Sequence, residues 1–258
     1  MSDTNIMFLG TTACIFDKND DDPCFLINKK YLFDTGFALV NNLVNNDVEP
    51  LDIKYLFFTH MHHDHYISLP AFLFYYIQKG GNLSELKIIG PANDVRRIVK
   101  KAMDFLEFKK PESEWVQVIE LEPDETYETE DMIFETCNSV HGVQGLCYRI
   151  TDKNTKAVIC ATGDTQLNAN LNTFFKGCDL LVHEISLGFE ENPVVRHGHS
   201  TVYEAVDLAN DVGAKQLFFV HNSRKISEDV IKYADAKFKG KVALWPEIGV
   251  YYKVKNGM

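Results

Sequence analysis

The chain has 258 residues and a formal net charge of −11, from 26 basic and 37 acidic residues. Apolar residues make up 45% and charged residues 24%, the mixture of a globular protein, which excludes a disordered chain. The acidic balance disfavours a long nucleic-acid footprint, because such a footprint depends on Lys and Arg. The six cysteines form no C-x-x-C pair, so we expect reduced thiols and no disulfide scaffold.

The first ten residues, MSDTNIMFLG, place an acid before the apolar run and no basic segment, so we expect no signal peptide. The longest apolar-rich stretch, 67–77, covers eleven residues and contains Pro70. A membrane helix needs about 20 residues. We therefore expect a cytoplasmic protein without a membrane segment, organised as one domain over residues 1–258.

Short apolar runs rich in β-branched and aromatic residues recur along the chain and predict strands. The expected strands are 6–9, 24–27, 31–33, 55–59, 86–89, 115–121, 132–136, 146–150, 157–161, 180–182, 216–220 and 250–254. Stretches with helical spacing lie between them. The expected helices are 36–45, 66–79, 92–107, 167–175, 201–212 and 227–237.

In each half of the chain, hairpin-like strand pairs come before strand–helix units. This order predicts an α/β fold with two sheets covered by helices.

Residues 17–22 are polar and precede Pro23, which predicts a surface turn. Residues 120–131 carry seven acids and no base, which predicts a solvated connection between the halves, with an acidic docking patch as the alternative.

Four of the nine histidines fall within six residues, His60-Met61-His62-His63-Asp64-His65. The cluster follows a predicted strand and precedes a helical stretch, so it should lie at the carboxyl end of that strand, where ligands of α/β sheets gather. Imidazole and carboxylate groups both suit Zn²⁺. Burying so many polar rings without partners would cost about 1–3 kcal/mol each, so the sequence predicts a metal site.

Three further residues extend this pattern, because His141, Asp164 and His221 each follow a predicted strand. Two metal ions about 3.5–4 Å apart need several nitrogen ligands and a bridging carboxylate. Five imidazoles together with Asp64 and Asp164 supply such a set.

With these residues the chain resembles the metallo-β-lactamase superfamily. The family motif H-x-H-x-D-H is matched by His60, His62, Asp64 and His65, and its distal His, Asp and His by His141, Asp164 and His221. Leu32-Phe33-Asp34-Thr35-Gly36 resembles the early "D-x-G" turn. The resemblance implies a hydrolase with an αββα sandwich, in which helices flank two mixed sheets, and two Zn²⁺ ions, with Mn²⁺ or Fe as alternatives.

The resemblance also implies how the ligands are shared. His60, His62 and His141 would hold one ion, Asp64, His65 and His221 the other, and Asp164 would bridge them. The resemblance also implies a catalytic role for Asp64. A hydroxide between the ions would attack the substrate, because metal binding lowers the pKa of water towards about 7.

A finer resemblance points to the RNase Z-like branch. Its characteristic segments are matched by Met7-Phe8-Leu9-Gly10-Thr11, by Thr59–His65 with Leu69-Pro70, by His183-Glu184 with Ser186, by Gly198-His199-Ser200-Thr201, and by His221-x-Ser223. In that branch the Glu and the later His form a dyad, which implies the same for Glu184 and His199. A carboxylate partner raises the pKa of a His, which suits His199 to protonate an expelled alkoxide.

Each of these assignments has a structural alternative. Glu184 could be a solvated acid at a strand end, and His199 could simply precede a capping box formed by Thr201 and Glu204. His63 fills a variable position and is not expected to bind metal, whereas His183 is expected to support the site. The remaining predicted substrate contacts are His197, Ser223 and Lys225, the last two in Ser223-Arg224-Lys225-Ile226, where the branch usually has "S-x-R-Y".

The chain departs from typical RNase Z enzymes in one respect. Those enzymes carry a long arm for tRNA between the ligands matched here by His141 and Asp164, but only 23 positions separate these residues, and a predicted strand pair fills them. A basic run between Arg96 and Lys110 is a possible phosphate track, but is better explained as one face of a helix. The chain thus resembles armless relatives, among them anti-Pycsar cyclic nucleotide phosphodiesterases.

The leading hypothesis is a dinuclear zinc phosphodiesterase that hydrolyses a small 3′,5′-cyclic nucleotide, with long nucleic acid not expected as a partner. The alternatives are a tRNA 3′-processing endoribonuclease, a thioesterase or lactonase, and a non-catalytic nucleotide-binding protein.

The branch also implies a homodimer. The aromatic stretch Phe72-Leu73-Phe74-Tyr75-Tyr76-Ile77 is an interface candidate, with burial inside its own chain as the alternative.

Overall fold

The computed structural model describes residues 3–15, 17–111, 114–191, 194 and 196–257. Its strands form two seven-stranded sheets. The first sheet has the order β14-β1-β2-β3-β4-β5-β6, with β14 Tyr251–Val254, β1 Thr4–Gly10, β2 Cys24–Ile27, β3 Tyr31–Phe33, β4 Tyr55–Phe57, β5 Lys87–Pro91 and β6 Gln117–Leu121. The second has the order β13-β12-β11-β10-β9-β8-β7, with β13 Val242–Leu244, β12 Gln216–Val220, β11 Leu180–Glu184, β10 Val158–Ala161, β9 Leu146–Asp152, β8 Met132–Asn138 and β7 Thr126–Glu128.

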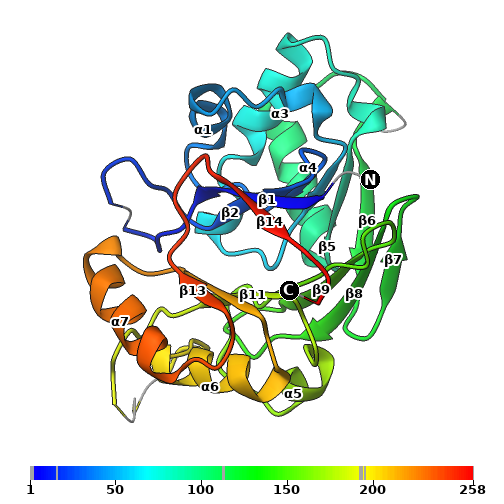
Figure 1. Ribbon diagram of the computed structural model, residues 1–258. Helices are drawn as coiled ribbons and strands as arrows, with labels where there is room; N and C mark the ends of the chain where they lie inside the picture. Colours follow the sequence, from blue (N-terminus) through cyan, green and yellow to red (C-terminus); the bar gives the residue numbers. More distant parts are fainter. Residues whose placement is uncertain (1–2, 16, 112–113, 192–193, 195, 258) are drawn as a thin grey trace.

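The helices form the two outer layers. They are α1 Leu39–Asn45, α2 His63–Tyr66, α3 Leu69–Gln78, α4 Asp94–Phe105, α5 Asn170–Phe174, α6 Val202–Val212 and α7 Ser227–Lys237, with short 3₁₀ helices η1 Pro50–Asp52, η2 Leu83–Glu85 and η4 Arg224–Ile226. In Figure 1, α1, α3 and α4 cover the first sheet, and α5, α6 and α7 cover the second. The predicted αββα sandwich is therefore confirmed.

The two sheets have the same internal pattern. In the first, β1 pairs antiparallel with β14 and with β2, β2 pairs antiparallel with β3, and the strands from β3 to β6 run parallel. In the second, the strands from β7 to β10 pair antiparallel, and those from β10 to β13 run parallel. Both sheets are thus mixed, as expected from hairpins followed by strand–helix units.

An aromatic core joins the two sheets. The ring of Phe57 on β4 stacks on Phe33 of the same sheet at 4.9 Å and on Phe134 of the other sheet at 4.2 Å between centroids. All three side chains are fully buried. Stacked aromatic pairs contribute about 0.5–1.5 kcal/mol each beyond the area they bury. This packing fixes the position of β4 directly before the histidine cluster.

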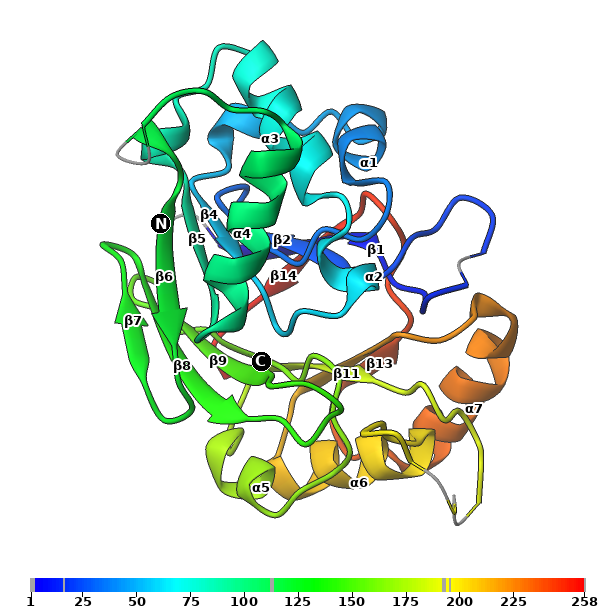
Figure 2. The same cartoon turned by 180° about the vertical axis from the view of Figure 1, so that it is seen from behind.

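Most predicted elements are confirmed within a few residues, but two strands were missed. β7 and β13 are three residues each and lie at the outer edges of the second sheet. Residues 120–131 do connect the two sheets, as predicted, but the connection is not wholly irregular, because it contains β7 (Figure 2). Because this segment is acidic and has no apolar run, the strand was not predicted. The side chains of β7 remain largely solvent-accessible, as is common at a sheet edge.

The turn predicted over 17–22 is not a simple surface turn. Asp21 and Asp22 are 2% and 0% exposed. The carboxylate of Asp21 accepts hydrogen bonds from the backbone N–H groups of Phe37 and Ala38 and from the amide of Asn42. These partners are distant in sequence, so composition alone could not reveal the burial.

The helix predicted over 66–79 corresponds to α3, and the separate short helix α2 ends at Tyr66, where the prediction began. Three members of the proposed interface stretch on α3, namely Phe72, Leu73 and Tyr76, are buried in the chain's own core, whereas Phe74 is 55% exposed. Half of the stretch therefore belongs to the core, but it is not buried wholly in its own chain, because Phe74 remains accessible. None of the helices in the described parts of the chain combines the length and apolarity that crossing a lipid bilayer requires.

Candidate metal centre

The predicted ligands come together where several strands end. His60 follows β4, His141 follows β8, and Asp164 follows β10. Glu184 is the last residue of β11, and His221 directly follows β12. The fold thus gathers side chains from both sheets at one edge, which is the usual position of ligand sites in sheets with parallel strands.

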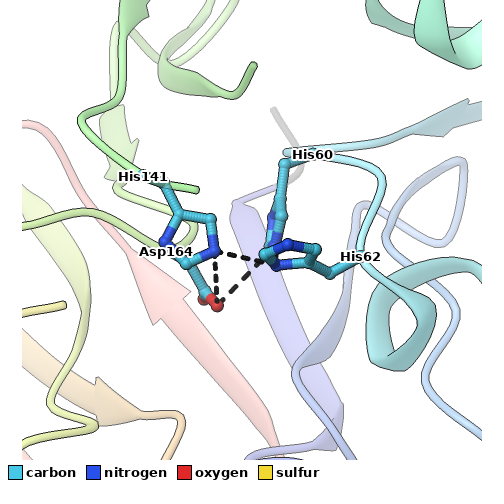
Figure 3. A group of neighbouring side chains, drawn as sticks. All are labelled: His60, His62, His141 and Asp164. Atoms are coloured by element: carbon cyan, nitrogen blue, oxygen red, sulfur yellow. Dashed lines mark hydrogen bonds and ion pairs between the residues drawn. The ribbon is translucent and has the colours of Figure 1, made fainter. Parts of the chain in front are cut away.

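The first subsite is the group His60, His62, His141 and Asp164. Figure 3 shows the three imidazoles and the carboxylate pointing toward one another. His62 Nδ1 lies 3.1 Å from His60 Nε2 and 2.8 Å from His141 Nε2. Asp164 Oδ2 lies 3.7 Å from His60 Nε2 and 3.8 Å from His141 Nε2.

The second subsite is the group Asp64, His65, Asp164 and His221, whose four members are all buried. His65 Nε2 lies 3.5 Å from Asp64 Oδ2 and 3.6 Å from Asp164 Oδ2. His221 Nε2 lies 3.4 Å from Asp64 Oδ2 and 3.2 Å from Asp164 Oδ2. Asp164 belongs to both subsites through the same oxygen, as expected for a bridging carboxylate.

These distances fit bound divalent ions. Ligand bonds of about 2.0–2.1 Å in tetrahedral geometry place donor atoms about 3.3 Å apart, and both subsites show spacings around this value. In addition, the buried Nε2 of His65 makes no hydrogen bond to any described residue. Buried polar atoms without hydrogen bonds are rare, so this nitrogen indicates a partner of another kind.

Two contacts outside the subsites orient the rings. The carboxylate of Asp34 accepts hydrogen bonds from His65 Nδ1 at 2.9 Å and from the backbone N–H and hydroxyl of Thr59. His141 Nδ1 donates to the carbonyl of Gly198 at 2.9 Å. Each bond fixes the tautomer in which Nε2 is available to a metal. The turn after a buried strand pointed to Asp34 in the sequence. No sequence pattern indicated that the Gly198 carbonyl orients His141.

The charges within the centre act strongly on one another. Burial and the charge of His65 hold the pKa of His60 well below its usual value. Burial opposes the charged form of His221, but the Asp164 carboxylate and the hydrogen bond to Asp64 raise its pKa to about 9. A divalent ion bound among these groups would displace any proton held by His221, because metal ligands must be deprotonated.

The predicted dyad is brought together beside the centre. His199 Nδ1 lies 3.1 Å from Glu184 Oε1, and Glu184 is 1% exposed. Burial alone would lower the pKa of His199, but the hydrogen bond and charge of Glu184 raise it. Glu184 is therefore not a solvated strand-end acid. The capping box of Thr201 and Glu204 is also present, so the cap and the dyad coexist.

Ser186 links the dyad to the second subsite, a connection the sequence did not indicate. Its hydroxyl lies 2.7 Å from Glu184 Oε2 and 2.6 Å from His221 Nδ1. Glu184 also accepts hydrogen bonds from the backbone N–H groups of Thr165 and Ser200. Glu184, His199 and His221 themselves form a third group close enough to hold an ion.

The predicted substrate contacts have different surroundings. His197 is exposed and lines an open groove beside the first subsite together with His62, Val140, His141, Gly142, Gln166 and Gly198. Ser223 instead donates to the carboxylate of Asp17 at 2.8 Å, and Lys225 is exposed on η4. His197 is thus placed beside the centre, whereas the hydroxyl of Ser223 is engaged by the loop between β1 and β2.

The two remaining histidines, His63 and His183, also lie outside both subsites. His63 is exposed at the start of α2 and belongs to neither subsite. His183 is fully buried on β11, and its Nδ1 donates to the carbonyl of Glu184. Neighbouring strand residues point to opposite faces, so His183 contacts only the backbone of the dyad residue.

The loop between β1 and β2 lies against the second subsite. Cys14 Sγ is 3.2 Å from Asp64 Oδ2, and the backbone N–H of His221 donates to the carbonyl of Thr11 at 2.7 Å. Burial and the charge of Asp64 raise the pKa of the Cys14 thiol to about 12 and that of Asp22 to about 7. The loop therefore adds a thiol and a carboxylate to the surroundings of the predicted ligands.

Comparison with known proteins agrees with this geometry. Residues 29–222 match the family model of the beta-lactamase superfamily domain. The chain is 22% identical to ribonuclease Z of Picrophilus torridus, with 90% of each chain covered. Its resemblance to the RNase Z-like branch is therefore confirmed.

Solved structures show the same fold. The metallo-beta-lactamase fold protein YhfI from Bacillus subtilis has a TM-score of 0.83 at 20% identity, covering 98% of this chain and 100% of that one. The short form of human tRNase Z has a TM-score of 0.77 at 20% identity, covering 97% and 99%. Yeast PDE1 has a TM-score of 0.75 at 14% identity, covering 99% and 100%. This chain belongs to the beta-lactamase superfamily and is a metal-dependent hydrolase.

Proposed function

We propose that this protein is a dinuclear phosphodiesterase that hydrolyses the 3′,5′-cyclic phosphate of a small nucleotide. The observation that carries the proposal is the buried Glu184 held 3.1 Å from His199 Nδ1, directly beside two His/Asp subsites. Ribonuclease Z, the named relative, acts on RNA, whose backbone consists of phosphodiesters. Phosphodiester cleavage expels an alkoxide, which is the kind of leaving group that needs a proton donor.

His60, His62 and His141 would hold one divalent ion, Asp64, His65 and His221 the other, and Asp164 would bridge them. Bound there, zinc or manganese would supply a hydroxide near neutral pH and neutralise charge on the phosphate. Asp34 and the Gly198 carbonyl keep the ligand rings oriented.

The chain's own residues account for the leaving group. As the oxygen of water attacks phosphorus, the bond from phosphorus to the 3′ oxygen breaks. His199 donates its Nε2 proton to that oxygen, while Glu184 holds the proton on Nδ1 and stabilises the charged ring. The product is a nucleoside monophosphate with a free 3′ hydroxyl. The attacking water loses one proton to solvent, and His199 regains its proton from solvent.

Three observations favour a small substrate over a tRNA precursor. The 23 positions from His141 to Asp164 contain β9 and β10, which leaves no length for an RNA-binding arm. The net charge is −11. Three of the four cations on α4 are paired with acids, Arg96 with Glu120, Arg97 with Asp94 and Lys100 with Asp104, so this helix is a poor phosphate track.

A panel of substrates tests the proposal. The purified protein, loaded with Zn²⁺ or Mn²⁺, is incubated with 3′,5′-cyclic nucleotides, a tRNA precursor with a 3′ trailer, and an acyl thioester. We expect turnover of a cyclic nucleotide that a chelator abolishes. His63→Ala, which removes an exposed histidine of the same motif, should keep full activity. Efficient trimming of the precursor with no cyclic nucleotide turnover would assign the protein to tRNA processing instead.

The assembly is also a proposal. We infer a homodimer in which His197, at the groove beside the first subsite, and the exposed Lys225 on η4 serve as substrate contacts. Because Phe72, Leu73 and Tyr76 are core residues, the interface cannot rest on the α3 stretch as a whole. Light scattering should report about twice the chain mass, and the mass of one chain would contradict this assignment.

A further inference from the structure

The second subsite contains a residue with a strained backbone. His221 has φ +64°, in the left-handed region that residues with a side chain seldom adopt. Such a conformation persists only where surrounding contacts hold it. The backbone N–H of His221 donates to the carbonyl of Thr11 at 2.7 Å, and His221 Nδ1 lies 2.6 Å from the hydroxyl of Ser186. The position of Thr11 therefore affects the direction in which His221 Nε2 points.

Thr11, which directly follows β1, is itself fixed by hydrogen bonds to other segments. Its backbone N–H donates to Asp20 Oδ1 at 2.8 Å, and its hydroxyl donates to Asp20 Oδ2 at 2.7 Å. The same hydroxyl accepts a hydrogen bond from Trp245 Nε1 at 2.9 Å. Thr11 is fully buried, and the side chain of Asp20 is 1% exposed. A carboxylate buried to this degree needs a cation as well as hydrogen-bond donors.

Arg224 supplies that cation and joins the segments around Thr11. Its Nε donates to Asp20 Oδ2 at 2.7 Å. Its Nη2 lies 3.2 Å from the hydroxyl oxygen of Thr11 and also donates to the carbonyl of Pro246. Because Nε and Nη2 are both engaged by protein groups, Arg224 serves this network rather than a substrate phosphate. Arg224 follows His221 by three residues, so its side chain connects the turn after β12 to the end of β1.

We propose that Arg224 is a positioning residue for the second subsite, because it holds Thr11 where the Thr11 carbonyl fixes the strained backbone of His221. The proposal rests on the dinuclear centre inferred above. Arg224 itself would contact neither ion nor substrate. Its loss would release Thr11 and let the backbone of His221 relax, so that His221 Nε2 would no longer be held toward Asp64 and Asp164, from which it now lies 3.4 and 3.2 Å.

The test is a titration of metal-free protein with Mn²⁺, in which electron paramagnetic resonance reports the free ion. We expect two bound ions in the wild type. Arg224→Ala should weaken one of them about tenfold, as is typical of residues that orient ligands, and leave the other unchanged. Arg224→Lys keeps a cation beside Asp20 and should lose less. Asp20→Asn should weaken the same ion, and the double variant should lose less than the two single losses combined, because both residues act through one network.

Arg149→Ala is the matched control. The side chains of Arg149 and Arg224 are 21% and 31% exposed, and each bonds backbone carbonyls and an acid. For Arg149 these are the carbonyls of Phe174 and Lys176 and the carboxylate of Glu135. Both alanine variants should lower the melting temperature, but Arg149→Ala should keep both Mn²⁺ affinities, because its described contacts include no member of either subsite.

Unchanged Mn²⁺ affinities in Arg224→Ala would overturn the proposal and leave the dinuclear centre intact. Equal losses at both ions, or the same loss in Arg149→Ala, would also overturn it, because either result indicates general destabilisation. If Arg224→Ala does not fold, Asp20→Asn provides the same comparison at constant volume. If the wild type binds a single ion, the dinuclear centre is wrong, and the role of Arg224 is decided by whether Arg224→Ala weakens that ion while Arg149→Ala does not.

Discussion

The two subsites share Asp164 but differ in their surroundings. In the first, His62 and His141 border the groove that also contains His197. In the second, all four members are buried, and the loop between β1 and β2 lies against them. For the proposed dinuclear centre, the difference predicts a division of roles, in which the first subsite would meet the substrate and the second would retain its ion by burial and negative charge.

Removal of the shared carboxylate should have the largest effect, because it damages both subsites. Asp164→Ala should weaken both ions by more than the roughly 10–100-fold typical of supporting residues, and should reduce turnover to background. Elemental analysis and a cyclic nucleotide assay measure these losses. Asp104→Ala, at an exposed acid on α4, is the control. Retention of one ion at full affinity would show that the subsites do not share this ligand.

Loss of the proton donor should separate chemistry from metal binding. His199→Ala should slow cyclic nucleotide hydrolysis by roughly 10²–10⁴-fold while both ions stay bound. A nitrophenyl phosphodiester has a better leaving group and should lose much less. If metal content falls with the rate, the third group of Glu184, His199 and His221 holds an ion and the dyad assignment is wrong.

A glycine substitution should damage the first subsite alone. Gly198 has φ +79°, and a Cβ there would lie 2.7 Å from His141 Nδ1. Gly198→Ala should displace this ring and weaken one ion by about 100-fold. The matched control is Gly213→Ala, at φ +71° with nothing within 4 Å of its Cβ, which adds the same backbone strain without the contact. Equal metal affinities in the two variants would contradict the expectation.

A milder change should affect the second subsite alone. Asp34→Asn keeps the volume but places a neutral group opposite His65 Nδ1. We expect about tenfold weaker binding of one ion, because the carboxylate no longer fixes the ring's tautomer and basicity. Calorimetric titration with Zn²⁺ measures the loss. The affected ion should be the one that Gly198→Ala leaves unchanged, and loss of the same ion in both variants would contradict the division of roles.

The sequence predicts much of this centre because its strongest signals are local. His60, His62, Asp64 and His65 lie within six positions after a buried strand, and the distal ligands also follow strands. Glu184 and His199 were instead predicted from the resemblance of residues 183–186 and 198–201 to segments of the RNase Z-like branch. Short edge strands such as β7 and β13 have too few residues to show periodicity, so they were missed.

Other features depend on contacts between distant segments. The burial of Asp22 depends on how the loop between β1 and β2 packs against segments distant in sequence, where Cys14 contacts Asp64 and Thr11 contacts His221, and no local pattern encodes such packing. The orientation of His141 by the Gly198 carbonyl joins residues 57 positions apart. Ser223 was expected to face the substrate, but its hydroxyl bonds Asp17, 206 positions away. Such pairings are decided by tertiary packing.

Anomalous diffraction from crystals grown with Zn²⁺ or Mn²⁺ would locate the ions themselves and so test the dinuclear centre. We expect two peaks per chain, one among His60, His62, His141 and Asp164, the other among Asp64, His65, Asp164 and His221. A single peak, or a peak between Glu184 and His199, would contradict it.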